Sequence, residues 1–478
     1  MNSIKRWMAR LGLKAIGALA LGILTAGTAN AMPSFARQTG MSCNQCHFTH
    51  DPTPNFTIQG MKFRSLGYRI PERQTKLVAG QPSQGAKDGE VLSLPWDDYL
   101  SYRFESILAN KTFGANGTEL ASNPTTRMSW FVVGPLTDHI GFWNEFYIVG
   151  DYGANNCVGG SCVGGSAWAP GLPTWDEYDL VYTINPDAVQ ANGDVYSVRF
   201  TNQSIQESDG WGPNSIGAPN SLGPFGTLGG NAHPTTGGYR ITGWMHDRWD
   251  WQLGLRTGDN NNGWDRKMEE GSLAYYFDNT SDNTIGVKVM AQYGDDEIPY
   301  VTRDSLQSGP TQNPLYYTYG DAIPGITATR GAGLGAYMNT DLKNNTAIAP
   351  VFRWQRSDVG ASGGDSWAFA AGFAYGKDEY YDGASFKEDI FGAGFLYCYM
   401  HTYCIQPGYT HYLKYNFTDH TGVSYDIDNP DTLSLTLVYN PAMNFAVFAQ
   451  ISQGHSLSLT GPSSTSGVTV QIGLDFPM

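Results

Sequence analysis

The amino-acid sequence predicts an all-β protein, namely a transmembrane antiparallel β-barrel of about 16, or else 18, strands. Three observations predict this class. Only 15% of the 478 residues are charged, whereas a soluble protein carries about 25%, and glycine and aromatic residues are abundant. No apolar stretch after residue 31 is long enough for a membrane helix. A lipid-facing composition without such helices indicates a closed barrel, because only helices and closed barrels satisfy their backbone polar groups in lipid.

The third observation is an alternation of apolar and polar residues with a period of two. This alternation is typical of strands with lipid on one side and a wet lumen on the other. In the segment 283–293, Lys288 and Gln292 alternate with Val287 and Val289. The segments 100–108, 432–439 and 468–476 show the same pattern. A soluble β-sandwich or propeller would also alternate, but the sequence has no blade-like repeat.

About 18 segments have this pattern, including one that begins near residue 330. The segment 419–427 is weak, so that 16 strands fit as well. Short turns alternate with mostly long loops at 111–125, 153–173, 206–235 and 296–329. Bacterial outer-membrane barrels have short periplasmic turns, long extracellular loops and an even strand count. We therefore expect the bacterial outer membrane as the location, with outer-membrane lipid around the barrel and both termini in the periplasm.

The first 31 residues have the features of a secretory signal: a basic start, an apolar run at 15–27 and a small-x-small end at Ala29–Ala31. Its removal takes away four basic residues and no acidic ones, so the formal net charge changes from −15 to −19. A chain this negative is not expected to bind nucleic acid. The predicted parts are a signal peptide at 1–31, an N-terminal segment at 32–70, a polar linker at 71–96 and the barrel at 97–478.

The N-terminal segment contains Cys-Asn-Gln-Cys-His at 43–47. Cys-x-x-Cys-His is the attachment signature of c-type haem. The two thiols add across the two vinyl groups of haem, and the His becomes an axial ligand of the iron. A plain disulfide or redox dithiol is the weaker interpretation, and a zinc site would need two more ligands, of which only His50 is close. The sequence therefore predicts one covalently bound haem c on Cys43 and Cys46, with His47 on the iron.

Around this motif, residues 32–68 resemble the N-terminal segment of the fused cytochrome–porins of iron-oxidising bacteria. The matching features are "PSFARQTG", the single Cys-x-x-Cys-His, and then Pro54, Gly60, Phe63, Gly67 and Tyr68. The rest of the chain shares length and barrel pattern only. The resemblance implies an outer-membrane iron(II) oxidase with one c-type haem, a monohaem cytochrome c segment at 32–70 and a barrel of about 16 strands.

Met61 is the candidate for the sixth iron ligand, because it is the nearest thioether downstream of His47. An axial Met raises the reduction potential, which suits an acceptor of electrons from Fe²⁺. Met41 and His50 are too close to His47 in the chain to reach the opposite face of the haem. A lumen residue such as Met290 is an alternative ligand, and a packing role is the alternative for Met61.

The other four cysteines form two close pairs, Cys157 with Cys162 and Cys398 with Cys404. A secreted chain permits disulfides, and each pair would close a small ring. From the alternation of the connections, we expect both disulfides on the extracellular side.

These features together predict an outer-membrane barrel with a small helical haem segment in its lumen as a plug. We expect it to take single electrons from extracellular Fe²⁺ and to pass them to a periplasmic c-type cytochrome, as an iron(II):cytochrome c oxidoreductase. The haem has no predicted depth, because residues 68–96 would span about 90 Å if extended. Two alternatives remain open: a solute-conducting porin with a haem-bearing plug, and a conduit that reduces an extracellular acceptor.

Overall fold

The computed structural model describes most of the barrel and parts of the N-terminal segment. The predicted signal peptide and linker lie outside the described part of the chain. The described residues are 34–39, 46, 56–69, 99–114, 119–122, 125–137, 139–150, 155–158, 161–164, 174–190, 193–202, 205, 237–258, 266–279, 283–296, 342–356, 364–380, 385–400, 402–418, 422, 424–426, 431–442, 445–456 and 465–477.

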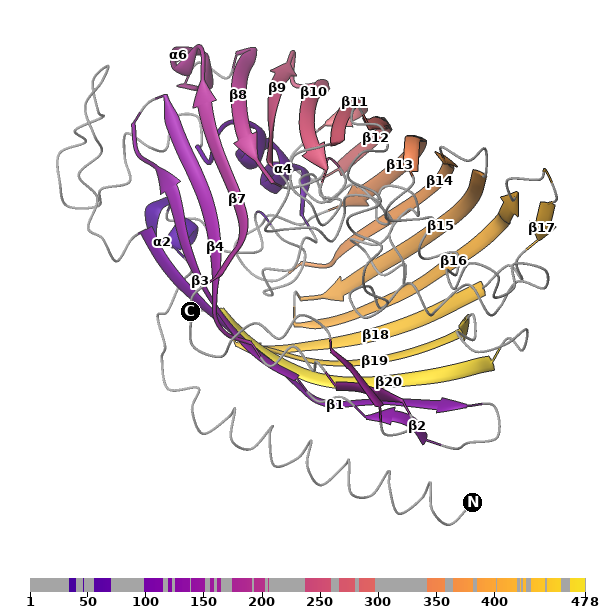
Figure 1. The fold of residues 1–478 in the computed structure, drawn as a ribbon. Helices are drawn as coiled ribbons and strands as arrows, with labels where there is room; N and C mark the ends of the chain where they lie inside the picture. The colour runs from indigo at the N-terminus through magenta and orange to yellow at the C-terminus, as the bar shows by residue number, and fades with distance from the viewer. Residues whose placement is uncertain are drawn as a thin grey trace.

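The barrel sheet contains eighteen described strands, of which β2 (Glu119–Ser122) and β17 (Ser424–Asp426) are short. The other sixteen form an antiparallel ring, which closes because β20 pairs with β1 from Arg103↔Pro477 to Gly114↔Gly467. Figure 1 shows the sheet curling round until β20 lies beside β1. The sixteen strands are β1 (Leu100–Gly114), β3 (Thr125–Pro135), β4 (Ile140–Gly150), β7 (Thr174–Thr183), β8 (Val195–Thr201), β9 (Gly237–Met245), β10 (Trp249–Gly258), β11 (Arg266–Asn279), β12 (Asn283–Asp296), β13 (Leu342–Arg356), β14 (Ser366–Tyr380), β15 (Ser385–Tyr399), β16 (Tyr403–Thr418), β18 (Asp431–Ala442), β19 (Phe445–Ser456) and β20 (Thr465–Pro477).

The predicted all-β antiparallel barrel is thus confirmed, and among the described residues its ring of consecutive pairings contains sixteen strands. Of the two segments that separate 18 strands from 16, the one expected near residue 330 lies outside the described residues. The weak segment at 419–427 contains only β17, whose three residues pair with the end of β16 at 416–418. The structure also has a short helix, α6 (Pro186–Gln190), between β7 and β8.

Side chains alternate between the two faces of the barrel as the sequence predicts. On β8, Val198 and Phe200 are 36% and 39% exposed, whereas Ser197, Arg199 and Thr201 are buried. An apolar outer face and a polar inner face are the pattern of barrels that stand in lipid. The exposed apolar belt includes Leu253, Leu273, Val287, Ile348, Phe391 and Leu437.

The barrel has a short-turn end and a long-loop end. At the short-turn end, β9 and β10 join through residues 246–248, and β15 and β16 join through residues 400–402. The first and last strands also begin and finish there, because Arg103 pairs with Pro477. The longest connections, 202–236 and 297–341, belong to the long-loop end. Short turns face the periplasm in bacterial barrels, so the periplasmic location of both termini stays a prediction that this topology favours.

One cysteine pair lies at the other end from the one expected. Cys398 and Cys404 form a disulfide across the β15–β16 turn, with their Cα atoms 4.1 Å apart, and this turn belongs to the short-turn end. The expected position at the long-loop end was wrong because it counted a strand near residue 330, whereas β12 pairs directly with β13. Each added strand reverses the direction of the strands that follow. The side of the membrane that this turn faces stays a prediction. Cys157 and Cys162 are register partners in the hairpin of β5 (Asn155–Val158) and β6 (Ser161–Gly164), between β4 and β7. Their disulfide stays a prediction.

Candidate functional site

The candidate site is the part of the chain around Cys46. The structure describes Cys46, helix α2 (Ser34–Thr39) before it, and residues 56–69 after it, which contain helix α4 (Ile58–Ser65). We call these described parts together the lumen segment. Four other residues of the predicted haem site lie outside the described residues. They are the attachment residue Cys43, the iron ligand His47, and the two residues Met41 and His50 that were considered as ligands.

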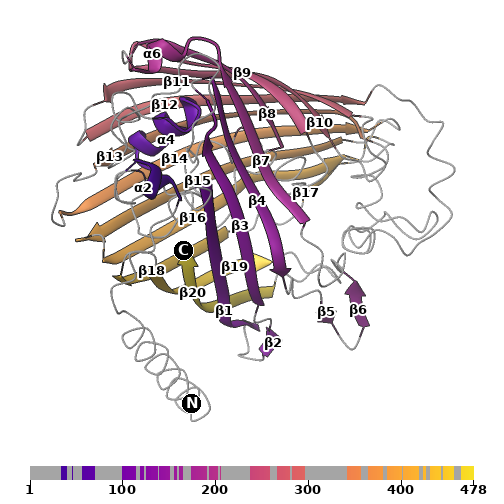
Figure 2. The ribbon, with the colours of Figure 1, turned by 90° about the vertical axis from the view of Figure 1, so that its left-hand side faces the viewer.

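The lumen segment packs against the inner face of the barrel. Figures 1 and 2 show α2 and α4 close to the strands from β3 to β9. The Ser34 backbone N–H donates a hydrogen bond to Ser101 Oγ on β1 (2.6 Å). Gln38 Nε2 donates to the Val133 carbonyl on β3 (2.9 Å). Because Ser101 and Val133 are buried inward residues, the segment occupies the lumen side of the wall.

Further contacts place this segment at the short-turn end. Arg69 Nη2 donates to the carbonyl of Thr137, which follows β3. Lys62 Nζ forms an ion pair with Asp247, in the β9–β10 turn, at 2.5 Å. Both partners belong to short turns, so the end of the lumen segment lies at that mouth of the barrel.

The start of α4 is packed tightly against Cys46. Thr57 caps the helix, since its side chain accepts a hydrogen bond from the Gly60 N–H (3.2 Å). The Thr57 N–H donates to the Cys46 carbonyl (2.9 Å). A Cβ atom at position 60 would lie only 2.3 Å from the Cys46 oxygen. This contact therefore requires glycine, and it joins Cys46 to α4.

Aromatic side chains gather beside Cys46. Phe35 of α2 stacks on Tyr68, with ring centroids 5.3 Å apart, and meets Phe63 of α4 edge-on at 4.9 Å. Cys46 and Trp143 of β4 pack against the same cluster. Aromatic pairs of this kind contribute about 0.5–1.5 kcal/mol beyond the burial of their area. The cluster thus holds α2, Cys46 and α4 together against the wall.

Met61 lies on the other side of α4. Residues two positions apart on a helix point about 200° apart, so Met61 faces away from Phe63 and the cluster around Cys46. Met61 is 4% exposed and packs in a second apolar cluster with the wall residues Trp244 and Met290. The two thioethers considered as iron ligands therefore share one cluster. The identity of the sixth ligand stays a prediction.

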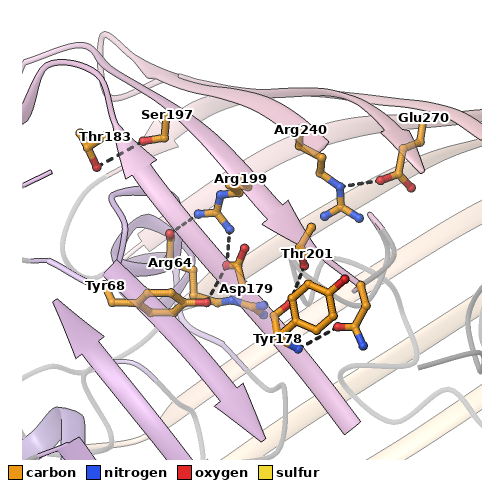
Figure 3. Close-up of polar contacts among 11 residues, drawn as sticks. Arg64, Tyr68, Tyr178, Asp179, Thr183, Ser197, Arg199, Thr201, Arg240 and Glu270 are labelled. Atoms are coloured by element: carbon orange, nitrogen blue, oxygen red, sulfur yellow. Dashed lines mark hydrogen bonds and ion pairs between the residues drawn. The ribbon is translucent and has the colours of Figure 1, made fainter. Parts of the chain in front are cut away.

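The end of the lumen segment is held by a buried network, which Figure 3 shows. The Tyr68 hydroxyl donates to Asp179 Oδ2 (2.6 Å), and Arg199 Nη1 donates to the same oxygen (2.9 Å). Arg199 also donates to the Arg64 carbonyl at the end of α4. Burial raises the pKa of Tyr68 well above its usual value of 10, and the negative charge of Asp179 adds to the rise. The phenol is therefore a hydrogen-bond donor at neutral pH.

Two wall glycines make room for the lumen segment. A Cβ atom at Gly141 of β4 would lie 2.1 Å from the Gly67 carbonyl oxygen. At Gly134 of β3, where φ is +141°, it would lie 2.6 Å from the Gln38 amide. Gly67 and Tyr68 have φ values of 70° and 62°, which turn the chain sharply after α4. The inner wall is therefore shaped to receive this particular backbone.

The polar contacts of Tyr68, Asp179 and Arg199 were not predicted from the sequence. The structure places Asp179 and Arg199 at inward positions of neighbouring strands, because β7 and β8 pair in the register Asp179↔Thr201 and Val181↔Arg199. In the described part of the chain, no group of three or more His, Cys, Asp or Glu side chains is placed to hold a metal ion. No helix in that part is long and apolar enough to cross a membrane.

Comparison with known proteins identifies the fold of the barrel. No protein-family model and no curated protein matches the chain. Among solved structures, OprB of Pseudomonas putida aligns with a TM-score of 0.50 at 10% identity, over 79% of this chain and 93% of that chain. OmpT of Vibrio cholerae aligns with a TM-score of 0.46 at 12% identity, over 81% of this chain and 100% of that chain. An anion-selective porin from Comamonas acidovorans gives 0.44 at 10% identity, over 79% and 98%. The chain thus has a porin-like β-barrel fold.

Proposed function

We propose that this protein is an outer-membrane c-type cytochrome–porin. It oxidises extracellular Fe²⁺ and passes the electrons to a periplasmic c-type cytochrome. The observation that carries the proposal is that Cys46 of the Cys-x-x-Cys-His motif belongs to a segment built into the inner wall of a porin-like barrel. Such a segment joins a redox group to a membrane-spanning scaffold.

The described surroundings of Cys46 fit a haem group. Phe35, Phe63, Tyr68 and Trp143 provide an apolar, aromatic environment next to the thiol. An environment of this kind suits a porphyrin and limits the access of water. Haem bound through Cys43 and Cys46, with His47 on the iron, supplies one-electron redox chemistry.

Contacts of the chain's own residues place the proposed redox site at one end of the barrel. The exposed apolar belt holds the barrel in lipid. The contacts of Arg69 and Lys62 fix the lumen segment at the short-turn end. If that end faces the periplasm, as in bacterial barrels, a soluble electron carrier meets the segment at the mouth of the barrel.

Fe²⁺ is proposed as the donor on two grounds. The first is the resemblance of residues 32–68 to the segment of iron-oxidising cytochrome–porins. The second is charge, because a mature chain with a formal net charge of −19, after the loss of four basic residues from −15, attracts a divalent cation rather than an anion.

The test is a spectrum of the purified full-length protein, mixed with Fe²⁺ without oxygen. We expect the visible bands of ferric haem to change to those of ferrous haem, with about one Fe²⁺ consumed per haem. Mn²⁺ is the control, because it has the same charge and is a much weaker reductant. Haem that dithionite reduces and Fe²⁺ does not would refute the proposed donor.

A solute-conducting porin is the second candidate, and the porin-like fold favours it. The tight packing of the lumen segment against the wall at one mouth of the barrel argues against a wide open pore. Conductance across planar bilayers separates the two functions.

Replacement of Met61 tests the sixth ligand. If Met61 binds the iron, Met61→Ala lowers the midpoint potential and alters the oxidised-state spectrum. Because Met61 is buried in an apolar cluster, we also expect Met61→Ala to cost about 2–5 kcal/mol of stability. Met61→Leu separates the two effects, since it keeps the packing and removes the sulfur. An unchanged spectrum in Met61→Leu would exclude Met61 and direct attention to residues such as Met290.

A further inference from the structure

One side chain links the cluster around Cys46 to the barrel wall. The ring of Tyr68 stacks on Phe35 and lies against Phe63, in the cluster that contains Cys46. Its hydroxyl reaches out of that cluster to Asp179 of β7. Tyr68 therefore touches the predicted haem pocket with its ring and the wall with its oxygen.

The acceptor of this hydrogen bond is a buried charge. Asp179 and Arg199 are 1% and 3% exposed, so both charges have left water. A buried ion pair is worth little by itself, but the loss of one partner is strongly destabilising, because the other charge then stays uncompensated. Asp179 Oδ2 accepts from both Tyr68 and Arg199, whereas Asp179 Oδ1 is buried with no hydrogen-bond partner among the described residues. The Tyr68 bond therefore provides part of the compensation of this carboxylate.

Arg199 closes the network back onto the lumen segment. It binds the Arg64 carbonyl in the last turn of α4, which also accepts from the Gly67 backbone N–H (3.0 Å). The two wall residues thus hold the segment at two points, the helix end and the turn that follows it. Figure 3 shows both contacts converging from β7 and β8.

The wall contains a second buried ion pair. Arg240 of β9 pairs with Glu270 of β11 at 2.5 Å. That pair joins β9 and β11 within the wall. The Asp179–Arg199 pair is instead shared with the lumen segment, at the place where Gly141 leaves space for the Gly67 backbone.

We propose that Tyr68, Asp179 and Arg199 form a latch that fixes the lumen segment, and that Tyr68 is a positioning residue for the haem. The positioning role rests on the proposed function, because it requires a haem on Cys43 and Cys46. The latch itself does not. Loss of the Tyr68 bond weakens the attachment of α4 to the wall, so that the helix opens from the wall more often and water comes closer to the haem.

The test uses the full-length, haem-loaded protein in detergent and compares Tyr68→Phe with Tyr178→Phe. Tyr178 is the matched control, because it precedes Asp179 on the same strand and its ring packs against Phe200 of the exposed outer belt, 5.0 Å between centroids. Each substitution removes one hydroxyl group and keeps the ring. Two quantities are measured: hydrogen exchange of the α4 amides and the midpoint potential of the haem.

In Tyr68→Phe we expect the α4 amides to exchange about ten- to a hundredfold faster, which corresponds to the loss of one hydrogen bond to a charged acceptor. Exchange in β7 and β8 should change much less. The midpoint potential should fall, because water stabilises the ferric form. Tyr178→Phe should match the unchanged protein in both measurements. Combining Tyr68→Phe with Asp179→Asn should give less than the product of the single effects, because both act on one network.

Unchanged α4 exchange in Tyr68→Phe would overturn the latch, and an unchanged potential would overturn the positioning role. If Tyr68→Phe does not fold, Arg199→Lys replaces it, since lysine keeps the charge and loses the planar donor group that reaches both Asp179 and Arg64. The same increase in α4 amide exchange is then expected, and unchanged α4 exchange would again overturn the latch. Hydrogen exchange of the α4 amides does not depend on Fe²⁺. The latch can therefore be tested even if the protein does not oxidise iron.

Discussion

Replacing Cys46 with serine is expected to abolish or cripple covalent attachment of haem. Attachment needs both thiols of the motif, and serine has no sulfur to add to a vinyl group. In the unchanged protein, acid–organic extraction should leave the colour on the denatured chain. In Cys46→Ser, the colour should be lost or should pass into the organic phase.

The structure gives this experiment a clear interpretation. Cys46 contacts α4 through its backbone carbonyl, which accepts from Thr57 and packs on Gly60. Serine keeps that carbonyl, so the loss of haem would be due to the thiol itself. The double variant Cys398→Ser/Cys404→Ser is the control, because it removes two cysteines at a remote turn and should keep its haem. Haem that extracts freely from the unchanged protein would contradict covalent attachment.

The purified protein alone should stop after one electron per chain. One haem stores one electron, so Fe²⁺ oxidation needs an acceptor to continue. Adding a soluble periplasmic c-type cytochrome should restore continuous oxidation when oxygen and other acceptors are excluded. The measurement is Fe²⁺ consumption over time, before and after the addition.

Sustained oxidation by the barrel alone under those conditions would contradict an obligatory carrier. The Cys46→Ser protein serves as the control for reactions that need no haem. The contacts of the lumen segment at the short-turn end favour a carrier that docks at that mouth. The carrier cytochrome can be supplied on either side of a vesicle that contains the barrel. If it restores oxidation only on the long-loop side, the proposed direction of electron transfer is reversed.

Local patterns in the sequence predicted the fold well. The alternation of Lys288 and Gln292 with Val287 and Val289 corresponds to buried and exposed faces of β12. The strand count depended on single segments. Counting a strand near residue 330 gave the higher count and also put the Cys398–Cys404 disulfide at the wrong end of the barrel. Parity errors of this kind arise because each added strand reverses the direction of the strands that follow.

The position of the candidate site was beyond the sequence. The motif at 43–47 is local and predicts its own chemistry, but the linker allows any depth in the lumen. The position depends on pairs that are far apart in the chain, such as Arg199 with Arg64, 135 residues apart. A single sequence does not show which distant residues meet, and a tyrosine after a glycine gives no indication of a buried acceptor such as Asp179.

The wide separation of these contacts sets an order for biogenesis. Ser34 binds Ser101 of the first strand, Lys62 binds Asp247, and Arg353 Nη2 binds the Phe56 carbonyl across 297 residues of chain. The lumen segment therefore lacks part of its contacts with the wall until β13 has been made and placed. Contacts of such long range form slowly, because their loop-closure entropy must be overcome first. We expect a period during export in which Cys43, Cys46 and His47 are still accessible in the periplasm, and an attachment enzyme has to act within it, before β20 joins β1 and encloses the segment.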